Sequence, residues 1–389
     1  MSVGLERRLR AAFGRLPDPS GEASARARAG ALAAFGSGHR GSRGALLLVA
    51  FAVTIAVGAS AAALAATGKL HVAIGSRSKS PRPIPTRLAV PPGSHGLAVV
   101  AGGKLWLATR SGLHIEGMPV SAAELSPRAL YAVVGIGTSL VSLAPGNRRP
   151  WVHQTGGRVV SASWSPDGLK IAYVVARRGS DGYELRLIEG DGAPDRLLVG
   201  SVRSAKPSWR ADSLAVAYVD ARGRAGVFDL GTDSTRTFDT RRCGGLAGAV
   251  AYDRRGAALA VVSAHGVAVV RRWNRPPSCA TLDISATPFA VGWLRRGQLL
   301  LGVNRRLGSS LERLSGTSLN EAGAAFGPGA VRGLALAPTG SSAMVAVRRS
   351  ARVADVGIVP SPDTGTRLKL TRPLLRIGDR GRVVSISWR

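Results

Sequence analysis

Short runs of apolar residues, separated by turn-forming residues, dominate the chain from about residue 96 onward. The clearest unit is residues 159–175, where V-V-S-A-S-W is followed by S-P-D-G and then by the apolar run I-A-Y-V-V. The alternation predicts a half-buried strand, and the continuous run predicts a strand buried on both faces. Proline presets φ, aspartate bonds its own backbone and glycine tolerates φ > 0, so S-P-D-G predicts the turn of a hairpin.

This hairpin pattern recurs along the chain. Its copies are spaced by about 40–45 residues, which leaves room for the four strands that a β-propeller blade needs. A large apolar or aromatic residue ends the first strand of each copy, and we expect these anchor residues to pack between neighbouring blades rather than to bind a ligand. The anchors are Leu125, Trp164, Trp209, Tyr252, Trp293 and Leu336.

The strongest copy resembles a known repeat. W-S-P-D-G at residues 164–168, followed by I-A-Y at 171–173, is similar to the WD40-like PD40 repeat of TolB-type propellers. The resemblance covers about residues 97–389, and the later copies keep fewer of the motif positions. It implies a β-propeller that lies outside the cytoplasm.

The two ends of the repeat region complement each other. Residues 97–108 predict a hairpin with no anchor strand before it, whereas V-V-S-I-S-W at 383–388 nearly repeats the anchor strand at 159–164. We therefore predict an all-β, seven-bladed propeller over residues 96–389, in which the last strand is the innermost strand of the first blade. The inward-facing residues of that strand are expected to be Val384, Ile386 and the seventh anchor, Trp388.

The chain before the propeller has a different pattern. Residues 1–44 are polar and arginine-rich, residues 45–66 carry no charge, and residues 67–95 are a Ser/Pro-rich linker. The uncharged run is long enough for one transmembrane helix across the roughly 30 Å hydrocarbon core. A cleaved signal peptide, with an A-x-A-like site at 63–65, is the alternative, but residues 1–44 exceed a normal n-region.

Flanking charges do not orient this predicted transmembrane helix, because basic residues lie on both sides of it. The resemblance places the propeller outside, so we expect a single-pass protein of the cell membrane with a cytoplasmic N-terminus. The head at 1–44 is then a short basic helix or a disordered tail.

The formal net charge of +30 raises the question of nucleic-acid binding. The basic residues are nearly all arginines, often in turn pairs such as those at 254–255 and 295–296. No RNA-binding or helix-turn-helix pattern is present. We therefore expect no nucleic-acid partner. A compositional bias towards Arg, Ala and Gly explains the charge, and attraction to anionic lipid or cell-wall polymers is the functional alternative.

Two cysteines bracket one predicted blade. Cys243 and Cys279 are the only cysteines of the chain, and both follow the predicted membrane span. In an oxidising compartment an isolated pair predicts a disulfide, with two buried free thiols as the alternative.

Catalytic patterns are missing from the sequence. The six histidines show no H-E-x-x-H or paired ligand spacing, no G-x-S-x-G elbow or P-loop occurs, and G-x-G-x-x-G at 36–41 follows no strand. Asp167, Asp191 and Asp212 lie in predicted turns and are expected to be turn formers. We expect no enzyme activity, cofactor or metal.

The sequence thus favours a membrane-anchored, non-enzymatic propeller that binds or scaffolds a protein or an envelope polymer. One alternative is a transmembrane signalling regulator, with the propeller as sensor and the basic head engaging a cytoplasmic partner. The other is an enzyme, which would need a polar cluster in the central channel.

Overall fold

The computed structural model describes the chain from residue 88 to residue 389. Its gaps are residues 89, 92, 178, 180, 272–276, 283–286, 306–307, 316–317, 326–330, 338, 351–352, 361–374 and 379–382. The predicted head (1–44), membrane span (45–66) and most of the linker (67–95) lie outside the described residues. Within the described ranges, no helix is long and apolar enough to cross a membrane.

Seven four-stranded antiparallel sheets make up the described part of the chain, and each sheet is one blade. Blade 1 contains β28 (Val383–Trp388), β1 (Gly96–Ala101), β2 (Lys104–Thr109) and β3 (His114–Pro119). Blade 2 contains β4 (Ala122–Leu125), β5 (Ala132–Ile136), β6 (Ser139–Leu143) and β7 (Val152–Gln154). Blade 3 contains β8 (Val159–Trp164), β9 (Lys170–Ala176), β10 (Tyr183–Glu189) and β11 (Asp195–Val202).

The remaining blades follow in chain order. Blade 4 contains β12 (Ser208–Trp209), β13 (Ala215–Val219), β14 (Ala225–Asp229) and β15 (Ser234–Phe238). Blade 5 contains β16 (Ala247–Tyr252), β17 (Leu259–Ser263), β18 (Gly266–Val270) and β19 (Ser278–Thr281). Blade 6 contains β20 (Thr287–Trp293), β21 (Leu299–Arg305), β22 (Gly308–Ser315) and β23 (Ser318–Ala325). Blade 7 contains β24 (Val331–Leu336), β25 (Ser342–Ser350), β26 (Val353–Pro360) and β27 (Leu375–Gly378).

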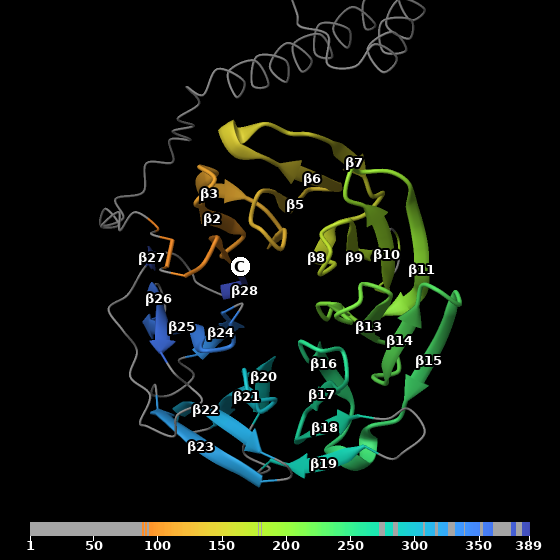
Figure 1. Cartoon of the computed structure of the whole chain (residues 1–389), viewed down its shortest axis with the longest axis vertical. Helices are drawn as coiled ribbons and strands as arrows, with labels where there is room; N and C mark the ends of the chain where they lie inside the picture. Colours follow the sequence, from red (N-terminus) through yellow and green to blue (C-terminus); the bar gives the residue numbers. More distant parts are fainter. Residues whose placement is uncertain are drawn as a thin grey trace, which may run out of the picture. The chain divides into compact units, whose positions relative to one another are not determined.

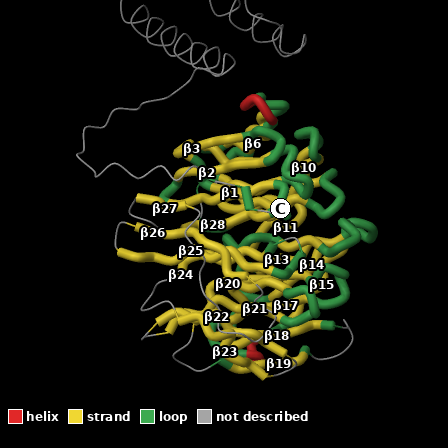
Figure 2. The backbone as a smooth tube through the Cα atoms, turned by 60° about the vertical axis from the view of Figure 1, so that its left-hand side comes forward, coloured by secondary structure: helices red, strands yellow, loops and turns green. Residues whose placement is uncertain are grey.

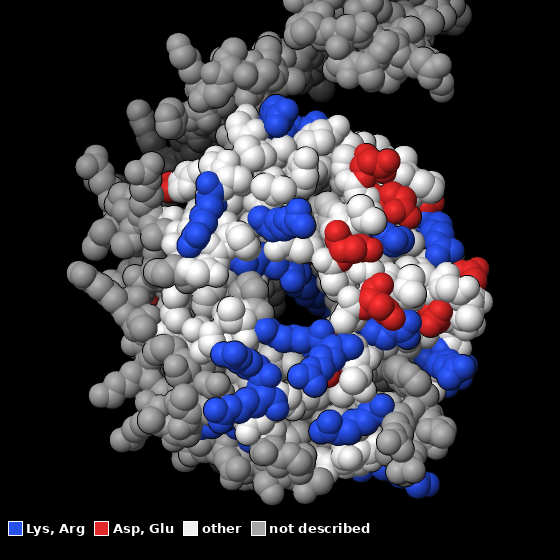
Figure 3. Space-filling view, in the orientation of Figure 1, with Lys and Arg blue, Asp and Glu red and all other residues white. Residues whose placement is uncertain are grey.

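The blades form a closed ring. The first strand given for each blade is the innermost, and these strands contact one another in the order β28, β4, β8, β12, β16, β20, β24 and back to β28. Figure 1 shows the blades arranged in a ring, and the space-filling view of Figure 3 shows a hollow at its centre, which is the mouth of a central channel. Helix is limited in the described residues to the short 3₁₀ turns η1 (Pro145–Asn147) and η2 (Arg241–Cys243), and Figure 2 shows strands almost throughout. The predicted all-β, seven-bladed propeller is confirmed.

The shared blade has the predicted strand order. β28 pairs antiparallel with β1, with Leu97 opposite Trp388 and Val99 opposite Ile386. Ile386 and Trp388 are both buried. Val384 belongs to the same strand, but its side chain lies outside the described set.

Local sequence explains the hairpins within the blades. In blade 3, Gly168 has φ 77° and donates its N–H to Ser165 O at 3.0 Å, while Asp167 Oδ1 accepts the N–H of Leu169 at 3.0 Å. Glycine adopts this left-handed conformation at little cost, and the aspartate mimics a backbone turn. The S-P-D-G segment therefore turns the chain from the innermost strand into β9.

The anchor residues end the innermost strands. Each lies at the last position of β4, β8, β12, β16, β20, β24 or β28, and all are buried except Leu336, which is half-buried. Two anchors also bond the preceding blade: Trp209 Nε1 donates to Ser163 O at 2.9 Å, and Trp293 Nε1 donates to Ala251 O at 2.8 Å. Their position between blades is that of packing residues.

A disulfide joins the two cysteines across blade 5. Cys243 ends η2 and Cys279 lies on the outermost strand β19, with their Cα atoms 5.0 Å apart and a sequence separation of 36. The bond therefore ties the segment leading into the blade to the outer edge of the same blade.

Removing this disulfide should weaken the propeller measurably. The double variant Cys243→Ala/Cys279→Ala is expected to lose about 3–4 kcal/mol of unfolding free energy, because an open loop of this length gains entropy when unfolded. Denaturant unfolding of the full-length chain measures the loss. Mass spectrometry of non-reduced, natively folded protein should find the two cysteine peptides linked, and two free thiols in that material would contradict the bond.

Candidate functional site

The turns that follow the innermost strands gather at one mouth of the channel, which we call the turn face. Neighbouring turns touch there: Asp167 N–H donates to Ser213 Oγ at 3.1 Å, joining the turns of blades 3 and 4. A Cβ built on Gly340 would lie 2.8 Å from Arg295 N, so the turns of blades 6 and 7 are equally close. Side chains on consecutive turns therefore share one surface.

Four arginines on the turns of blades 5 and 6 form what we call the basic arc. They are Arg254, Arg255, Arg295 and Arg296, and all four are exposed. Arg254 Nη2 donates to Ala337 O at 2.6 Å, so this side chain reaches from blade 5 to the turn of blade 7. Although Arg254 is exposed as a residue, partial desolvation of its guanidinium lowers its pKa below the usual value. No arginine of the arc forms an ion pair within the described residues.

Acidic side chains occupy a different sector of the turn face. Figure 3 shows Asp and Glu over blades 3 and 4, and Lys and Arg around the channel and over blades 5 and 6. Several of the acids are already paired, since Arg210 contacts Asp212 at 2.8 Å and Arg196 contacts Asp233 at 3.0 Å. The basic arc is therefore a sector of this face whose charge no described carboxylate compensates.

The three predicted turn aspartates lie in turns within the acidic sector. Asp191 Oδ1 accepts from Ala193 N at 3.1 Å, and Asp212 Oδ1 accepts from Leu214 N at 3.0 Å, as Asp167 does from Leu169. Burial opposes ionisation of Asp167 and Asp212, but hydrogen bonds from Ser165 and Arg210 respectively, and from the backbone, lower both pKa values. All three side chains hold turns, and the lowered pKa values keep Asp167 and Asp212 charged.

A buried carboxylate connects three blades inside the ring. Glu124, on the innermost strand β4, accepts from Lys206 Nζ at 2.6 Å and from Arg389 Nη2 at 2.8 Å. Lys206 precedes β12 of blade 4, and Arg389 follows β28 of blade 1. Sequence reasoning missed this cluster, although an acidic residue directly before the anchor Leu125 was a usable signal.

A cluster of strongly perturbed ionisable groups lies in the outer part of blade 3. Tyr173 donates its hydroxyl to Asp195 Oδ1 at 2.9 Å, and Arg186 Nη2 donates to Asp195 Oδ2 at 2.9 Å. Burial, and then the charge of Asp195, raises the pKa of Tyr173. Both Tyr173 and Arg186 thus engage the carboxylate of Asp195, and His153 Nε2 lies 3.2 Å from Asp195 Oδ2.

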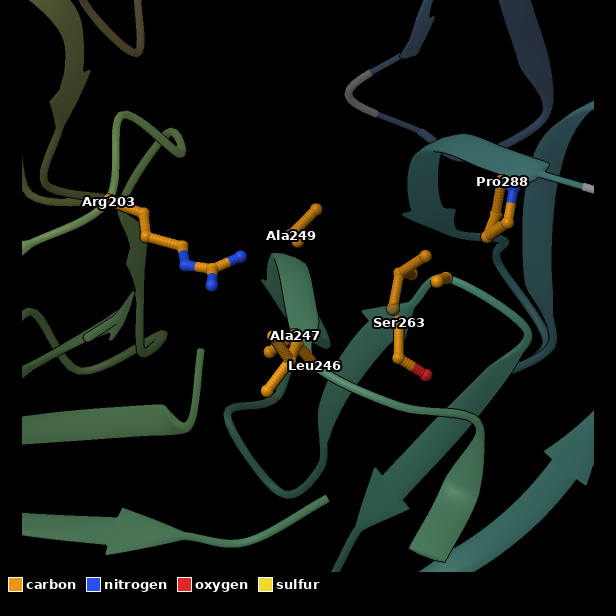
Figure 4. Close-up of a pocket in the computed structure, with 9 residues that line it drawn as sticks. Arg203, Leu246, Ala247, Ala249, Ser263 and Pro288 are labelled. Atoms are coloured by element: carbon orange, nitrogen blue, oxygen red, sulfur yellow. The ribbon is translucent and has the colours of Figure 1, made fainter. Parts of the chain in front are cut away.

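The opposite mouth, where the innermost strands begin, we call the start face. β-bulges interrupt the pairing of several innermost strands there, between Val159 and Ser161 in β8 and between Ala247 and Ala249 in β16. Two cavities open on this face. The larger, about 820 Å³, is lined by residues of blades 1 to 3 and their connections, among them Arg158, Tyr183 and Ser204. The smaller, about 380 Å³, contains Arg203 and lies against blade 5 (Figure 4).

Metal ligation gives no candidate site in the part of the chain that the structure describes. No group of three or more His, Cys, Asp or Glu side chains there is placed to hold a metal ion. The exposed arginines and cavities make the two mouths of the channel the candidate sites.

Comparisons with known proteins show similarity in fold but not in sequence. No protein-family model and no curated protein sequence matches the chain. A periplasmic gluconolactonase from Pseudomonas aeruginosa is similar in structure, with a TM-score of 0.55 and 14% identity over 75% of this chain and 98% of that one. The propeller domain of Cps50 (Swd1) from Myceliophteria thermophila has a TM-score of 0.51 and 12% identity over 71% of this chain and 88% of that one.

TolB from Acinetobacter baumannii is a weaker structural match. It has a TM-score of 0.46 and 12% identity, over 77% of this chain and 68% of that one, and at this score the likeness carries no argument. The gluconolactonase and Swd1 matches show a β-propeller fold, which hosts many unrelated functions. The chain is a seven-bladed β-propeller, and its function has to be argued from its own residues.

Proposed function

We propose that the chain is a non-enzymatic binding module that presents the basic arc of its propeller to an anionic envelope polymer. In this proposal residues 45–66 anchor the chain in the cell membrane, the head at 1–44 is cytoplasmic, and the linker at 67–95 holds the propeller outside. The observation that carries the proposal is the set of four exposed arginines with no described carboxylate partner at one mouth of the channel.

The chemistry of arginine supports an anionic ligand. A guanidinium presents a planar fork of donors that matches carboxylate and phosphate groups in a bidentate manner. The arc spans consecutive turns, so an extended polymer with repeating anionic groups can contact several arginines at once. The net charge of +30 favours approach of such a polymer, whereas it opposes association of the chain with itself.

Enzymatic and signalling roles are the competing explanations. A gluconolactonase shares the fold, but 14% identity carries no catalytic residue across to this chain. A signalling role would put the partner on the basic head rather than on the propeller. Both alternatives are separated from the proposal by measuring where an anionic polymer binds and whether gluconolactone is hydrolysed.

Neutralising part of the arc should weaken polymer binding. Linear polyphosphate is titrated into the full-length protein in neutral detergent, comparing Arg295→Gln/Arg296→Gln with Arg222→Gln/Arg242→Gln. Arg222 and Arg242 are exposed arginines on start-face segments, so the control pair removes the same charge elsewhere. We expect the arc variant to bind about tenfold more weakly at low salt, with a salt dependence of log Kd shallower by about one to two.

The same polyphosphate titrations of the arc variant and the control variant can also contradict the proposal. Equal weakening in both variants would mean that only net charge matters, and no weakening in the arc variant would place binding on the head or elsewhere. Either result contradicts the proposal. Hydrolysis of gluconolactone by the purified chain would overturn its non-enzymatic part.

A further inference from the structure

The Arg203 pocket, on the start face opposite the basic arc, is a separate cavity of about 380 Å³. Figure 4 shows the Arg203 side chain extending towards β16, with Leu246, Ala247 and Ala249 before it and Pro288 on the far side. Apart from Arg203 and Ser263, the lining is apolar or glycine. We propose that this pocket binds a small organic anion: a carboxylate carried by a short apolar group.

A bulge at a glycine creates the space. Pairing of β16 with β17 shifts between Ala247 and Ala249, so Gly248 is the extra residue of the bulge. A Cβ built on Gly248 would meet nothing closer than Val262 O at 3.8 Å. The corresponding bulge in β8 carries Val160, which lines the larger cavity. β-bulges commonly occur beside binding sites, where they redirect or remove a side chain.

The guanidinium of Arg203 has no carboxylate partner in the part of the chain that the structure describes. The Arg203 N–H donates to Val219 O at 2.9 Å, which fixes the backbone, and a Cβ on Gly223 would lie 3.1 Å from Arg203 Nη2. Asp220, the nearby acid in that turn, is engaged by Arg224 Nε at 2.7 Å. No ion pair of Arg203 occurs among the described residues, so its charge is available to a ligand.

Among the described lining residues, Arg203 carries the free charge and most of the others form an apolar wall. Ser263 donates its hydroxyl to Cys243 O at 3.1 Å and Gly266 O at 3.0 Å, so its proton is already used. A ligand therefore meets the guanidinium at one end and Leu246, Val262 and Pro288 elsewhere. The volume is at the lower end of the roughly 300–1,000 Å³ typical of small-molecule sites. Both features fit a branched carboxylate of a few carbons.

Two kinds of ligand present a carboxylate on a short apolar group. One is a free carboxylic acid, and the other is a peptide whose C-terminal residue is small and apolar. Calorimetric titrations of the full-length protein in neutral detergent distinguish them with four probes. The probes are isovalerate, its neutral isostere isovaleramide, the tripeptide Gly-Gly-Val and the same tripeptide amidated. We expect at least one free carboxylate to bind saturably and its uncharged partner to bind at least tenfold more weakly.

Three variants locate the binding. Gly248→Leu should abolish it by filling the pocket, and the open surroundings of Gly248 let the variant fold. Arg203→Gln should reduce carboxylate binding to the level of the amide, without filling the cavity. Arg158→Gln, an exposed arginine of the neighbouring cavity on the same face, should leave binding unchanged. A melting curve checks that each variant is folded.

Several results overturn the proposal. Equal binding of each carboxylate and its amide would exclude the guanidinium as the recognition group. Undiminished binding in folded Arg203→Gln or Gly248→Leu would place the site elsewhere, and no saturable binding of any free carboxylate would leave the pocket without this ligand class. None of these results bears on polyphosphate binding at the basic arc, so the two proposals fail independently.

Discussion

Deleting residues 383–389 from the full-length chain is expected to open the ring, so that the propeller aggregates or melts far below the parent temperature. The deletion removes β28, which pairs with β1 and is the innermost strand of blade 1. It thereby exposes an unpaired edge of β1 and the inner faces of blades 2 and 7, which β28 contacts. Exposed strand edges of this kind are templates for aggregation.

The buried side chains lost with β28 determine how much stability the deletion removes. Ile386 and Trp388 are each 7% exposed, and truncation of a buried Ile or Trp costs about 2–5 kcal/mol. Folded domains are stable by only about 5–15 kcal/mol, so the deletion removes a large share of the total. The milder variant Trp388→Ala should lower the melting temperature by on the order of 10 °C, since about 1 kcal/mol shifts it by 2–4 °C in larger domains.

Scanning calorimetry measures the melting temperatures of the 383–389 deletion and of Trp388→Ala against the parent protein. Leu169→Ala is the control, because Leu169 is 61% exposed and its truncation should cost no more than about 0.5 kcal/mol. An unchanged melting temperature after deletion of 383–389 would contradict closure of the ring by β28.

Replacing both cations that contact Glu124, in the variant Lys206→Met/Arg389→Met, is expected to lower the unfolding free energy by about 3–5 kcal/mol. The reason is that the buried charge of Glu124 is then uncompensated. The Glu124 side chain is 3% exposed, while those of Lys206 and Arg389 are 43% and 31% exposed. The reverse change, Glu124→Gln, leaves two cations that water reaches, so it should cost less, about 1–3 kcal/mol.

A thermodynamic cycle makes this prediction specific. In the Lys206→Met/Arg389→Met background, adding Glu124→Gln should raise the unfolding free energy by at least about 1 kcal/mol, although the same change lowers it in the parent. Lys104→Met/Arg110→Met controls for the loss of two exposed cations. Denaturant unfolding measures all five proteins. If Glu124→Gln were equally destabilising in both backgrounds, the three groups would not be coupled.

Much of the fold was predictable because it repeats. The S-P-D-G turn, the regular anchors and the near-identity of 383–388 to 159–164 gave blade number, innermost strands and ring closure. These features are local, and the ring follows from stacking equivalent units. The head, the membrane span and most of the linker lie outside the described residues and stay predictions.

The candidate sites were much less predictable, because they join residues from different blades. The arginine pairs at 254–255 and 295–296 were visible in the sequence but were interpreted as composition. Only the fold brings them to one mouth of the channel. Glu124 and Arg389 meet only because the last strand closes the first blade. Gly248 within a strand was a recognisable bulge signal, but its proximity to Arg203 depends on how blades 4 and 5 pack.

The central claim is that the turn face binds an anionic polymer, and amide hydrogen exchange with and without polyphosphate tests it most directly. The full-length protein should show slower exchange at 253–256 and 294–297, the turns that carry the basic arc, when polyphosphate is bound. Exchange at 221–224 and 241–245, on the start face, should not change. Protection confined to the start face or to residues 1–44, with the two basic turns unaffected, would contradict the claim.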